Sequence, residues 1–267
     1  MDPKRLITAL IVLPSLYLFI RYAPVNYFFG LIFLIAMLGL FEFYAMCAIP
    51  AQFTIPGLFM GGIFFTTAFF YPQSLLLSVF FIMSVLMILR LFMVRNCQES
   101  LKTTSQLVLG IFYIPGFAVF IPLIMRDFGV PFILMLFASV WLADAMAYYV
   151  GKNFGKKKLY FEVSPNKTIE GAAGSVIGGC LAALIIYLLH SDMAISVTRV
   201  VFIGIIIGIV TIVGDLIESM FKRDAGVKDS SNMIPGHGGF LDKMDSFLLS
   251  GPILYILLKY LAWFKLR

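Results

Sequence analysis

Apolar stretches of membrane-spanning length follow one another along almost the whole chain, and they constrain its fold more than any other feature. A helix needs about 20 mainly apolar residues to cross the hydrocarbon core of a bilayer. Nine stretches of this kind occur, at residues 6–20, 25–47, 53–71, 74–93, 105–125, 130–150, 168–190, 197–221 and 247–263. They occupy most of the 267 residues, which leaves no room for a sizeable water-soluble domain. We therefore predict an all-α, polytopic integral membrane helix bundle of about nine transmembrane helices.

The composition excludes the other common classes of chain. Hydrophobic residues make up 61% of the sequence and charged residues 13%, whereas a soluble domain is about a quarter charged. Disorder requires the opposite balance, with low hydrophobicity and high charge. Cys47, Cys97 and Cys180 are far apart and show no C-x-x-C spacing, so they predict neither a disulfide framework nor a zinc site.

The distribution of basic residues predicts how the bundle lies in the membrane. Lys4 and Arg5 precede the first apolar stretch, and no small-x-small cleavage site follows it, so we interpret it as an uncleaved span. With a cytoplasmic N-terminus, 14 of the 20 Lys and Arg residues fall on cytoplasmic segments, as the positive-inside rule requires. We expect a multi-pass protein of the inner cell membrane, and we attribute the net charge of +6 to topology rather than to nucleic-acid binding.

Acidic residues are distributed unevenly along the chain. Ten of the fourteen lie between Asp144 and Asp245, and four lie in the first 143 residues. The sequence shows no linker between two domains. We therefore predict a single membrane domain over residues 1–267, in which 1–140 is mainly scaffold and 141–267 is the catalytic half.

Asp144 is the first acidic group of this second half, within the apolar stretch 130–150. Intramembrane carboxylates are costly and usually mark a functional path, although a structural, hydrogen-bonded aspartate near a helix end would look the same. The basic loop that follows, with Lys156 to Lys158, is typical of an anchor on anionic headgroups.

The string Ser164-Pro-Asn-Lys-Thr-Ile-Glu170-Gly171 predicts a helix start. Ser164 or Asn166 is expected to cap the helix, with Thr168 and Glu170 in its first turn. Lys167 opposes the helix macrodipole at this end unless an anion is bound, so it indicates a phosphate site.

Small residues recur at helical spacing in two of the later stretches, as Gly171, Gly174 and Gly178, and as Gly204 and Gly208. Such residues let membrane helices approach closely. We interpret them as packing positions, either within the subunit or in a homodimer.

A polar stripe ends the stretch 197–221. Asp215, Glu218 and Lys222 are three and four residues apart, so they share one face of the helix and line a wet cavity at the cytoplasmic membrane edge. In the segment 219–245, Asp242 and Asp245 are one turn apart and suit a hard cation. Glycines on both sides of His237 let backbone N–H groups approach phosphate. Together these features predict a magnesium–polyphosphate site.

The segment from Ser219 to Asp245 closely resembles the signature of the CDP-diacylglycerol synthases (phosphatidate cytidylyltransferases). The positions that fit the signature are Ser219, Lys222, Arg223, Lys228, Asp229, Pro235, His237, Gly238, Gly239, Asp242 and Asp245. One position departs from it, because Lys243 stands where the family usually has an arginine, whose bidentate phosphate fork a lysine lacks. The segments around Asp144 and 164–171 are also similar to the family.

The resemblance implies the reaction of CTP with phosphatidate to give CDP-diacylglycerol and pyrophosphate, with Mg²⁺ as cofactor. It implies these candidate catalytic residues: Lys167, Asp215, Lys222, Arg223 and Asp242. The implied metal ligands are Asp215 and Asp242, with Asp144 and Asp245 completing the shell or holding a second cation. The implied substrate-binding residues are Ser164, Asn166, Thr168, Ser219, Lys228, Asp229, His237, Gly238 and Gly239. Its partners would be CTP, phosphatidate and the lipid bilayer.

Two other functions use similar residues. An ion-coupled transporter also needs intramembrane carboxylates, but it leaves the glycine-rich segment around His237 without a use and predicts an inverted repeat that the sequence does not show. A different membrane enzyme of lipid phosphates, such as a polyprenol kinase or a CDP-alcohol phosphotransferase, is the second alternative. The spaced aspartate pattern of the phosphotransferases is absent from this sequence.

Overall fold

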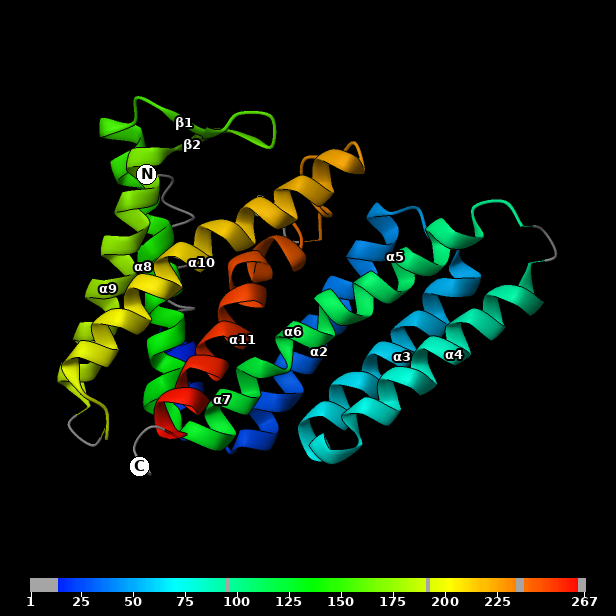
Figure 1. Ribbon diagram of the computed structural model, residues 1–267, viewed down its shortest axis with the longest axis horizontal. Helices are drawn as coiled ribbons and strands as arrows, with labels where there is room; N and C mark the ends of the chain where they lie inside the picture. The colour runs from blue at the N-terminus through cyan, green and yellow to red at the C-terminus, as the bar shows by residue number, and fades with distance from the viewer. Residues whose placement is uncertain (1–13, 95–96, 191–192, 234–237, 264–267) are drawn as a thin grey trace.

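The computed structural model describes residues 14–94, 97–190, 193–233 and 238–263, and the side chains among them up to residue 260. The described chain is almost entirely helical (Figure 1). Residues 14–22 are helical. The helices that follow are α2 (Val25–Met46), α3 (Ala51–Phe70), the short 3₁₀ turn η1 (Pro72–Ser74), α4 (Leu75–Met93), α5 (Ser100–Tyr113), α6 (Pro115–Ala118), α7 (Phe120–Phe128), α8 (Val130–Phe154), α9 (Ile169–Leu189), α10 (Val197–Asp224) and α11 (Leu241–Trp263). Two short strands, β1 (Lys158–Tyr160) and β2 (Ser164–Thr168), stand between α8 and α9.

The predicted class, an all-α membrane bundle, is confirmed. Among the described residues, seven helical segments are long and apolar enough to cross a bilayer. They are 25–46, 51–70, 72–93, 100–128, 130–154, 169–189 and 197–224, and each falls on one predicted span. The predicted span 6–20 lies largely outside the described residues, and 247–263 falls within α11, which is not among the seven. The total of nine is therefore not confirmed.

The predicted span 105–125 is broken into three helices, and Pro115 accounts for the first break. Pro115 stands at the first position of α6, where its missing N–H costs nothing. Without an N–H, it also cannot donate to the carbonyl of Ile111, four residues earlier, so α5 ends before it. At the far end, Gly129 has φ +94°, a conformation that suits glycine and separates α7 from α8.

Glycines bring α8, α9 and α10 into close contact. A Cβ on Gly178 would lie 2.5 Å from the carbonyl oxygen of Leu142, and one on Gly208 would lie 2.6 Å from Cα of Val176. Ser175 Oγ donates to the carbonyl of Gly208 at 2.9 Å across the same interface. The glycines thus serve packing within the subunit, which is one of the two predicted alternatives.

The start of α9 differs from the prediction. Residues 164–168 form a strand that pairs antiparallel with β1, so neither Ser164 nor Asn166 caps the helix. Thr168 is the N-cap instead, because its backbone is extended and its Oγ1 accepts the N–H of Gly171 at 3.1 Å. Glu170 lies in the first turn, as predicted, and its carboxylate accepts the N–H groups of Lys156 and Lys157, which closes the hairpin onto the helix.

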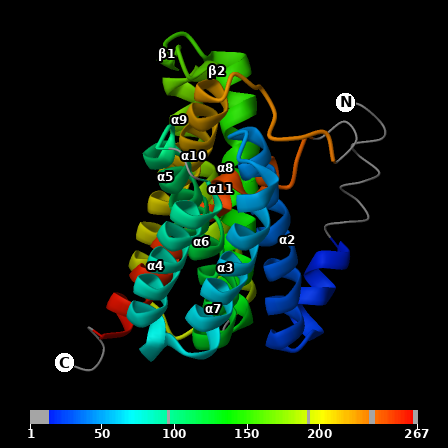
Figure 2. The same ribbon diagram turned by 90° about the vertical axis from the view of Figure 1, so that its right-hand side faces the viewer.

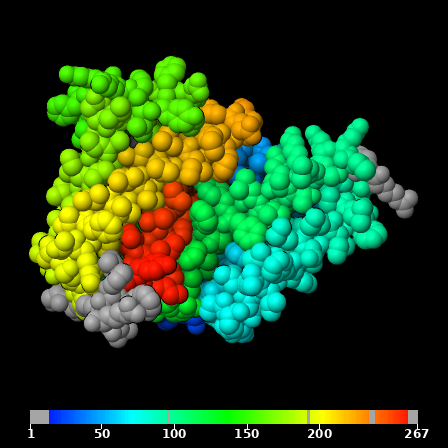
Figure 3. All heavy atoms as spheres, viewed as in Figure 1, coloured from blue at the N-terminus to red at the C-terminus, as the bar shows by residue number. Residues whose placement is uncertain are grey.

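The hairpin and the ends of α8 and α10 lie at one end of the bundle. Figures 1 and 2 show β1 and β2 at the top, opposite the connection between α9 and α10. The space-filling view shows α11 between α10 and the α6–α7 segment (Figure 3). On α4, large apolar side chains such as Leu77 and Phe92 remain exposed in the isolated chain, as expected for a helix that faces lipid.

Candidate active site

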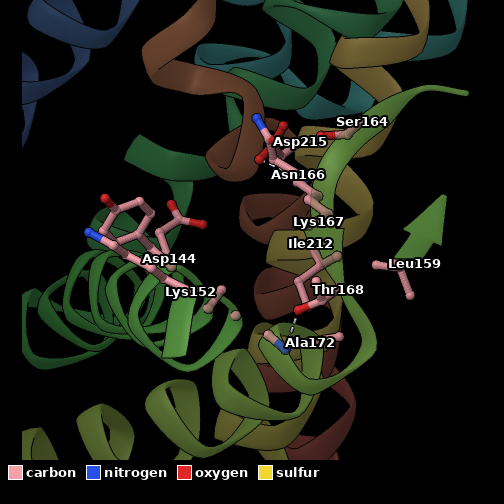
Figure 4. A pocket seen from close by; sticks show the side chains of 14 residues that line it. Asp144, Lys152, Leu159, Ser164, Asn166, Lys167, Thr168, Ala172, Ile212 and Asp215 are labelled. Carbon is pink, nitrogen blue, oxygen red and sulfur yellow. Dashed lines mark hydrogen bonds and ion pairs between the residues drawn. The ribbon is translucent and has the colours of Figure 1, made fainter. Parts of the chain in front are cut away.

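A cavity of about 550 Å³ opens where the hairpin meets α8, α9 and α10 (Figure 4). Asp144, Ala147, Tyr148, Gly151 and Lys152 line it from α8. Leu159 comes from β1, and Ser164, Asn166, Lys167 and Thr168 come from β2. Gly171 and Ala172 of α9 and Ile212 and Asp215 of α10 complete the wall. Asp144, Tyr148 and Gly151 are four and three residues apart, so α8 turns one face toward this cavity.

Lys167 and Asp215 form an ion pair in the cavity wall. The Lys167 ammonium lies 2.6 Å from Asp215 Oδ2, and both side chains remain partly exposed, at 22% and 32%. Ser219, one turn further along α10, donates its hydroxyl to Asp215 Oδ1 at 3.1 Å. The hairpin thus brings a cation to a carboxylate of α10, and both residues line the cavity.

A second and more buried cluster surrounds Lys222. Its ammonium lies 2.5 Å from Glu218 Oε2 and 2.7 Å from Asp242 Oδ1, and the Glu218 side chain is completely buried. The other oxygen of Asp242 accepts the N–H of Ser230 at 3.0 Å, its hydroxyl at 2.9 Å and the N–H of Gly239 at 2.7 Å. Each oxygen of Asp242 therefore already has a protein donor.

Carboxylates outnumber cations around these two clusters. Asp144 on α8, Asp215 on α10 and Asp245 on α11 lie close enough to interact electrostatically. The acidic groups are Asp144, Asp215, Glu218, Asp242 and Asp245, against Lys167 and Lys222. Among the described residues, this excess of carboxylates over cations favours the binding of a cation at the cavity.

The donor set is compatible with a magnesium ion that is only partly coordinated by protein. Within the described ranges, no group of three or more His, Cys, Asp or Glu side chains is arranged to hold a metal. Magnesium, however, is usually held by one or two carboxylates together with substrate phosphates and water. Asp144, Asp215 and Asp245 are the carboxylates near the cavity that could supply such ligands. Asp215 and Asp242, predicted as a pair, contact different lysines.

The remaining predicted residues are distributed around the mouth of the site. Arg223 donates to the carbonyl groups of Val163 and Val227, at 3.4 and 3.0 Å, so it ties α10 to the hairpin. Lys228 and Asp229 are exposed on the segment after α10. Pro235, Gly236 and His237 lie outside the described residues.

Two motif glycines have structural reasons in this fold. Gly238 has φ +79°, and a Cβ there would lie 2.6 Å from Asp242 Oδ2. A Cβ on Gly239 would collide with Ser230 Oγ and with the carboxylate of Glu42. Their contact with phosphate remains a prediction, since the N–H of Gly239 is directed at Asp242.

Glu42 on α2 contacts the motif segment, and it is not among the residues predicted from the sequence. It is 1% exposed and accepts four hydrogen bonds from the segment that contains the motif. A signal was present, because a carboxylate within an apolar stretch is expensive and usually functional. Residues 1–140 therefore contribute more than scaffold.

Comparisons with known proteins agree with the motifs. Residues 3–261 match the model of the cytidylyltransferase family. The chain is 42% identical over 132 residues to the phosphatidate cytidylyltransferase of Bacillus subtilis (strain 168), covering 49% of each chain. It is 46% identical over 136 residues to that of Staphylococcus aureus (strain COL), covering 50% of this chain and 51% of the relative. The chain thus matches about half the length of these curated relatives. The resemblance drawn from residues 219–245 is confirmed, and the chain belongs to the cytidylyltransferase family.

Proposed function

We propose that this chain transfers CMP from CTP to phosphatidate, giving CDP-diacylglycerol and pyrophosphate, in a magnesium-dependent reaction of phospholipid biosynthesis. The cavity that places Lys167 against Asp215 beside Asp144 carries the proposal. It combines a cation for phosphate with carboxylates for a metal, at the end of a membrane bundle where a water-soluble nucleotide and a lipid can meet. The relatives, which are named phosphatidate cytidylyltransferases, support the same substrates.

The chemistry requires alignment more than proton transfer. A phosphate oxygen of phosphatidate forms a bond to the α-phosphorus of CTP, while the bond to the bridging oxygen breaks and pyrophosphate leaves. A phosphate monoester is largely dianionic near neutral pH, since its second pKa is about 6. The attacking oxygen therefore needs no strong general base, and the site must instead hold two mutually repelling anions in line.

Lys167 is placed to bind one of these anions. Its side chain lines the cavity, with the ammonium nitrogen enclosed against Asp215, beside the N-terminus of α9, where backbone N–H groups favour a phosphate. A phosphate oxygen would compete with Asp215 for Lys167, and Ser164 and Asn166 on the same strand offer further polar contacts.

Magnesium, when bound, neutralises the triphosphate and stabilises the leaving pyrophosphate. Asp144, Asp215 and Asp245 would hold it together with substrate phosphates. Asp242, whose oxygens accept from Lys222, Ser230 and Gly239, keeps the cluster around Lys222 in place beside them.

Lys167→Ala is expected to raise the apparent KM for CTP or phosphatidate at least tenfold, or to abolish turnover. Lys157→Ala is the matched control, because this lysine is exposed on the hairpin and does not line the cavity; its effect should stay below tenfold, or about 1.4 kcal/mol of barrier. The assay follows labelled CTP with phosphatidate and Mg²⁺ in detergent. Equal effects of the two variants would assign anion binding to the hairpin as a whole. Wild-type protein that forms no CDP-diacylglycerol would refute the proposed reaction.

The proposed site faces the cytoplasm, and cysteine labelling tests this orientation. After replacement of the three native cysteines, Asp229→Cys should react with an impermeant thiol reagent only in inverted vesicles. Gln73→Cys, in the turn between α3 and α4, should react only in intact cells. Labelling of Asp229→Cys from outside would place the site on the opposite face and remove its access to cytoplasmic CTP.

A further inference from the structure

The carboxylate of Glu42 joins the first half of the chain to the motif segment. Oε1 accepts the Ser231 hydroxyl at 2.6 Å and the Phe240 N–H at 3.0 Å. Oε2 accepts the Ser230 hydroxyl at 3.1 Å and the Leu241 N–H at 2.8 Å. These donors are 188 to 199 residues away in the sequence. One side chain of α2 thus binds the motif segment at two places, at Ser230 and Ser231 and again at Phe240 and Leu241.

Two of these donors explain why an acid is needed at position 42. The N–H groups of Phe240 and Leu241 stand at the start of α11, where helical N–H groups have no partner within the helix. A negative charge is favourable at this end of a helix dipole. A buried carboxylate, in turn, is tolerated only when it is well hydrogen-bonded, and four donors provide that.

Ser230 carries the contact from Glu42 to the site. Its hydroxyl lies 3.1 Å from Glu42 Oε2 and 2.9 Å from Asp242 Oδ2, so its single proton can be donated to either carboxylate. Asp242 in turn binds Lys222 through its other oxygen at 2.7 Å. A continuous chain of polar contacts therefore runs from α2 through the motif segment to α10.

Gly239 lies against this connection. Its Cα position leaves no space for a side chain, because a Cβ would meet both Ser230 Oγ and the Glu42 carboxylate. The close approach of Glu42 therefore gives this position a requirement for glycine that is independent of any substrate.

We infer that Glu42 is a positioning residue for the reaction, acting through Ser230 and the start of α11 to hold Asp242 and Lys222 in place. The expected loss of turnover rests on the proposed function. The hydrogen bonds that tether the motif segment to Glu42 are themselves a property of the fold. Glu42 lines no part of the described cavity, so its effect should reach catalysis through geometry.

Glu42→Gln tests the inference with the smallest change of shape. An amide has a single acceptor oxygen, and its NH₂ group would face two donors, one of which is a backbone N–H that cannot reorient. We expect turnover to fall at least tenfold with the KM for CTP within about threefold, and amide exchange to accelerate in peptides covering residues 238–245. Glu99→Gln, the same change at an exposed position, should alter neither.

Two further variants separate positioning from simple stability. Glu42→Asp keeps both acceptor oxygens and should recover part of the lost turnover. A double variant of Glu42→Gln with Asp242→Asn should be no slower than Asp242→Asn alone, since residues that act through one group are not additive.

Unchanged turnover and unchanged exchange in Glu42→Gln would overturn the inference. So would additive losses in the double variant, accompanied by faster exchange throughout the protein, because these would indicate general destabilisation. If wild-type protein were inactive with CTP and phosphatidate, the proposed function would fail by itself. Faster exchange confined to 238–245 would then still support the tether, and unchanged exchange would refute it.

Discussion

Replacing Asp215 by asparagine is expected to lower turnover by about 100-fold or more, because the loss of one metal-directed carboxylate removes several kcal/mol of charge stabilisation. Asn keeps the shape of the side chain and can still accept the Ser219 hydroxyl. It cannot supply the negative charge that pairs with Lys167 and would hold Mg²⁺ against water. The measurement is CMP transfer to phosphatidate across a Mg²⁺ titration, on protein first shown to be folded.

Asp224→Asn is a suitable control for this prediction, since Asp224 ends the same helix and is exposed. It should keep near-normal activity. Combining Asp215→Asn with Asp242→Asn should be little worse than the more damaging single change, since Asp242 is expected to hold the cluster beside the metal ligands and thus to act through the same unit. Near-normal, Mg²⁺-dependent turnover by folded Asp215→Asn would remove Asp215 from the metal site and leave it as a structural partner of Lys167.

Hydropathy alone predicted most of the fold, since length and apolarity decide which segments can cross a bilayer. It failed where polar residues enter a helix or where structure depends on pairing. Helix α11 begins at Leu241 rather than 247, because Asp242 and Asp245 are helical but lower the mean hydropathy of the first turns. The strands of the hairpin are three and five residues long and show no clear alternation, so only their mutual pairing reveals them.

The candidate site was predictable as a set of residues but not as a set of pairs. Helical spacing correctly placed Glu218 one turn from Lys222, and the two are in contact. It could not show that Asp215 pairs with Lys167 while Asp242 pairs with Lys222, because these contacts cross between elements. Glu42 carries a local signal, as a carboxylate within an apolar stretch, but its partners could not be named from the sequence, since its donors lie near the other end of the chain.

The buried cluster around Lys222 gives the largest expected effect on stability. Lys222→Met should lower the free energy of unfolding by about 3–5 kcal/mol, the cost of removing one partner from a buried ion pair. The Glu218 side chain is fully buried and that of Lys222 is 11% exposed, so water cannot replace the lost ammonium. Equilibrium unfolding in mixed micelles measures the change.

Lys102→Met is the matched control, because Lys102 pairs with Glu99 at a surface where the two side chains are 65% and 72% exposed. Exposed pairs contribute about 0–1 kcal/mol. The double variant of Lys222→Met with Glu218→Gln should be more stable than Lys222→Met, since it leaves one buried carboxylate fewer without a counter-ion. If that double variant folds and still transfers CMP at a normal rate, Lys222 is a structural cation and Lys167 remains the candidate for substrate phosphate. If Lys222→Met lowered the free energy of unfolding by less than about 1 kcal/mol, the cluster would not stabilise the fold. A role in the reaction would then be the reason for a lysine at this position.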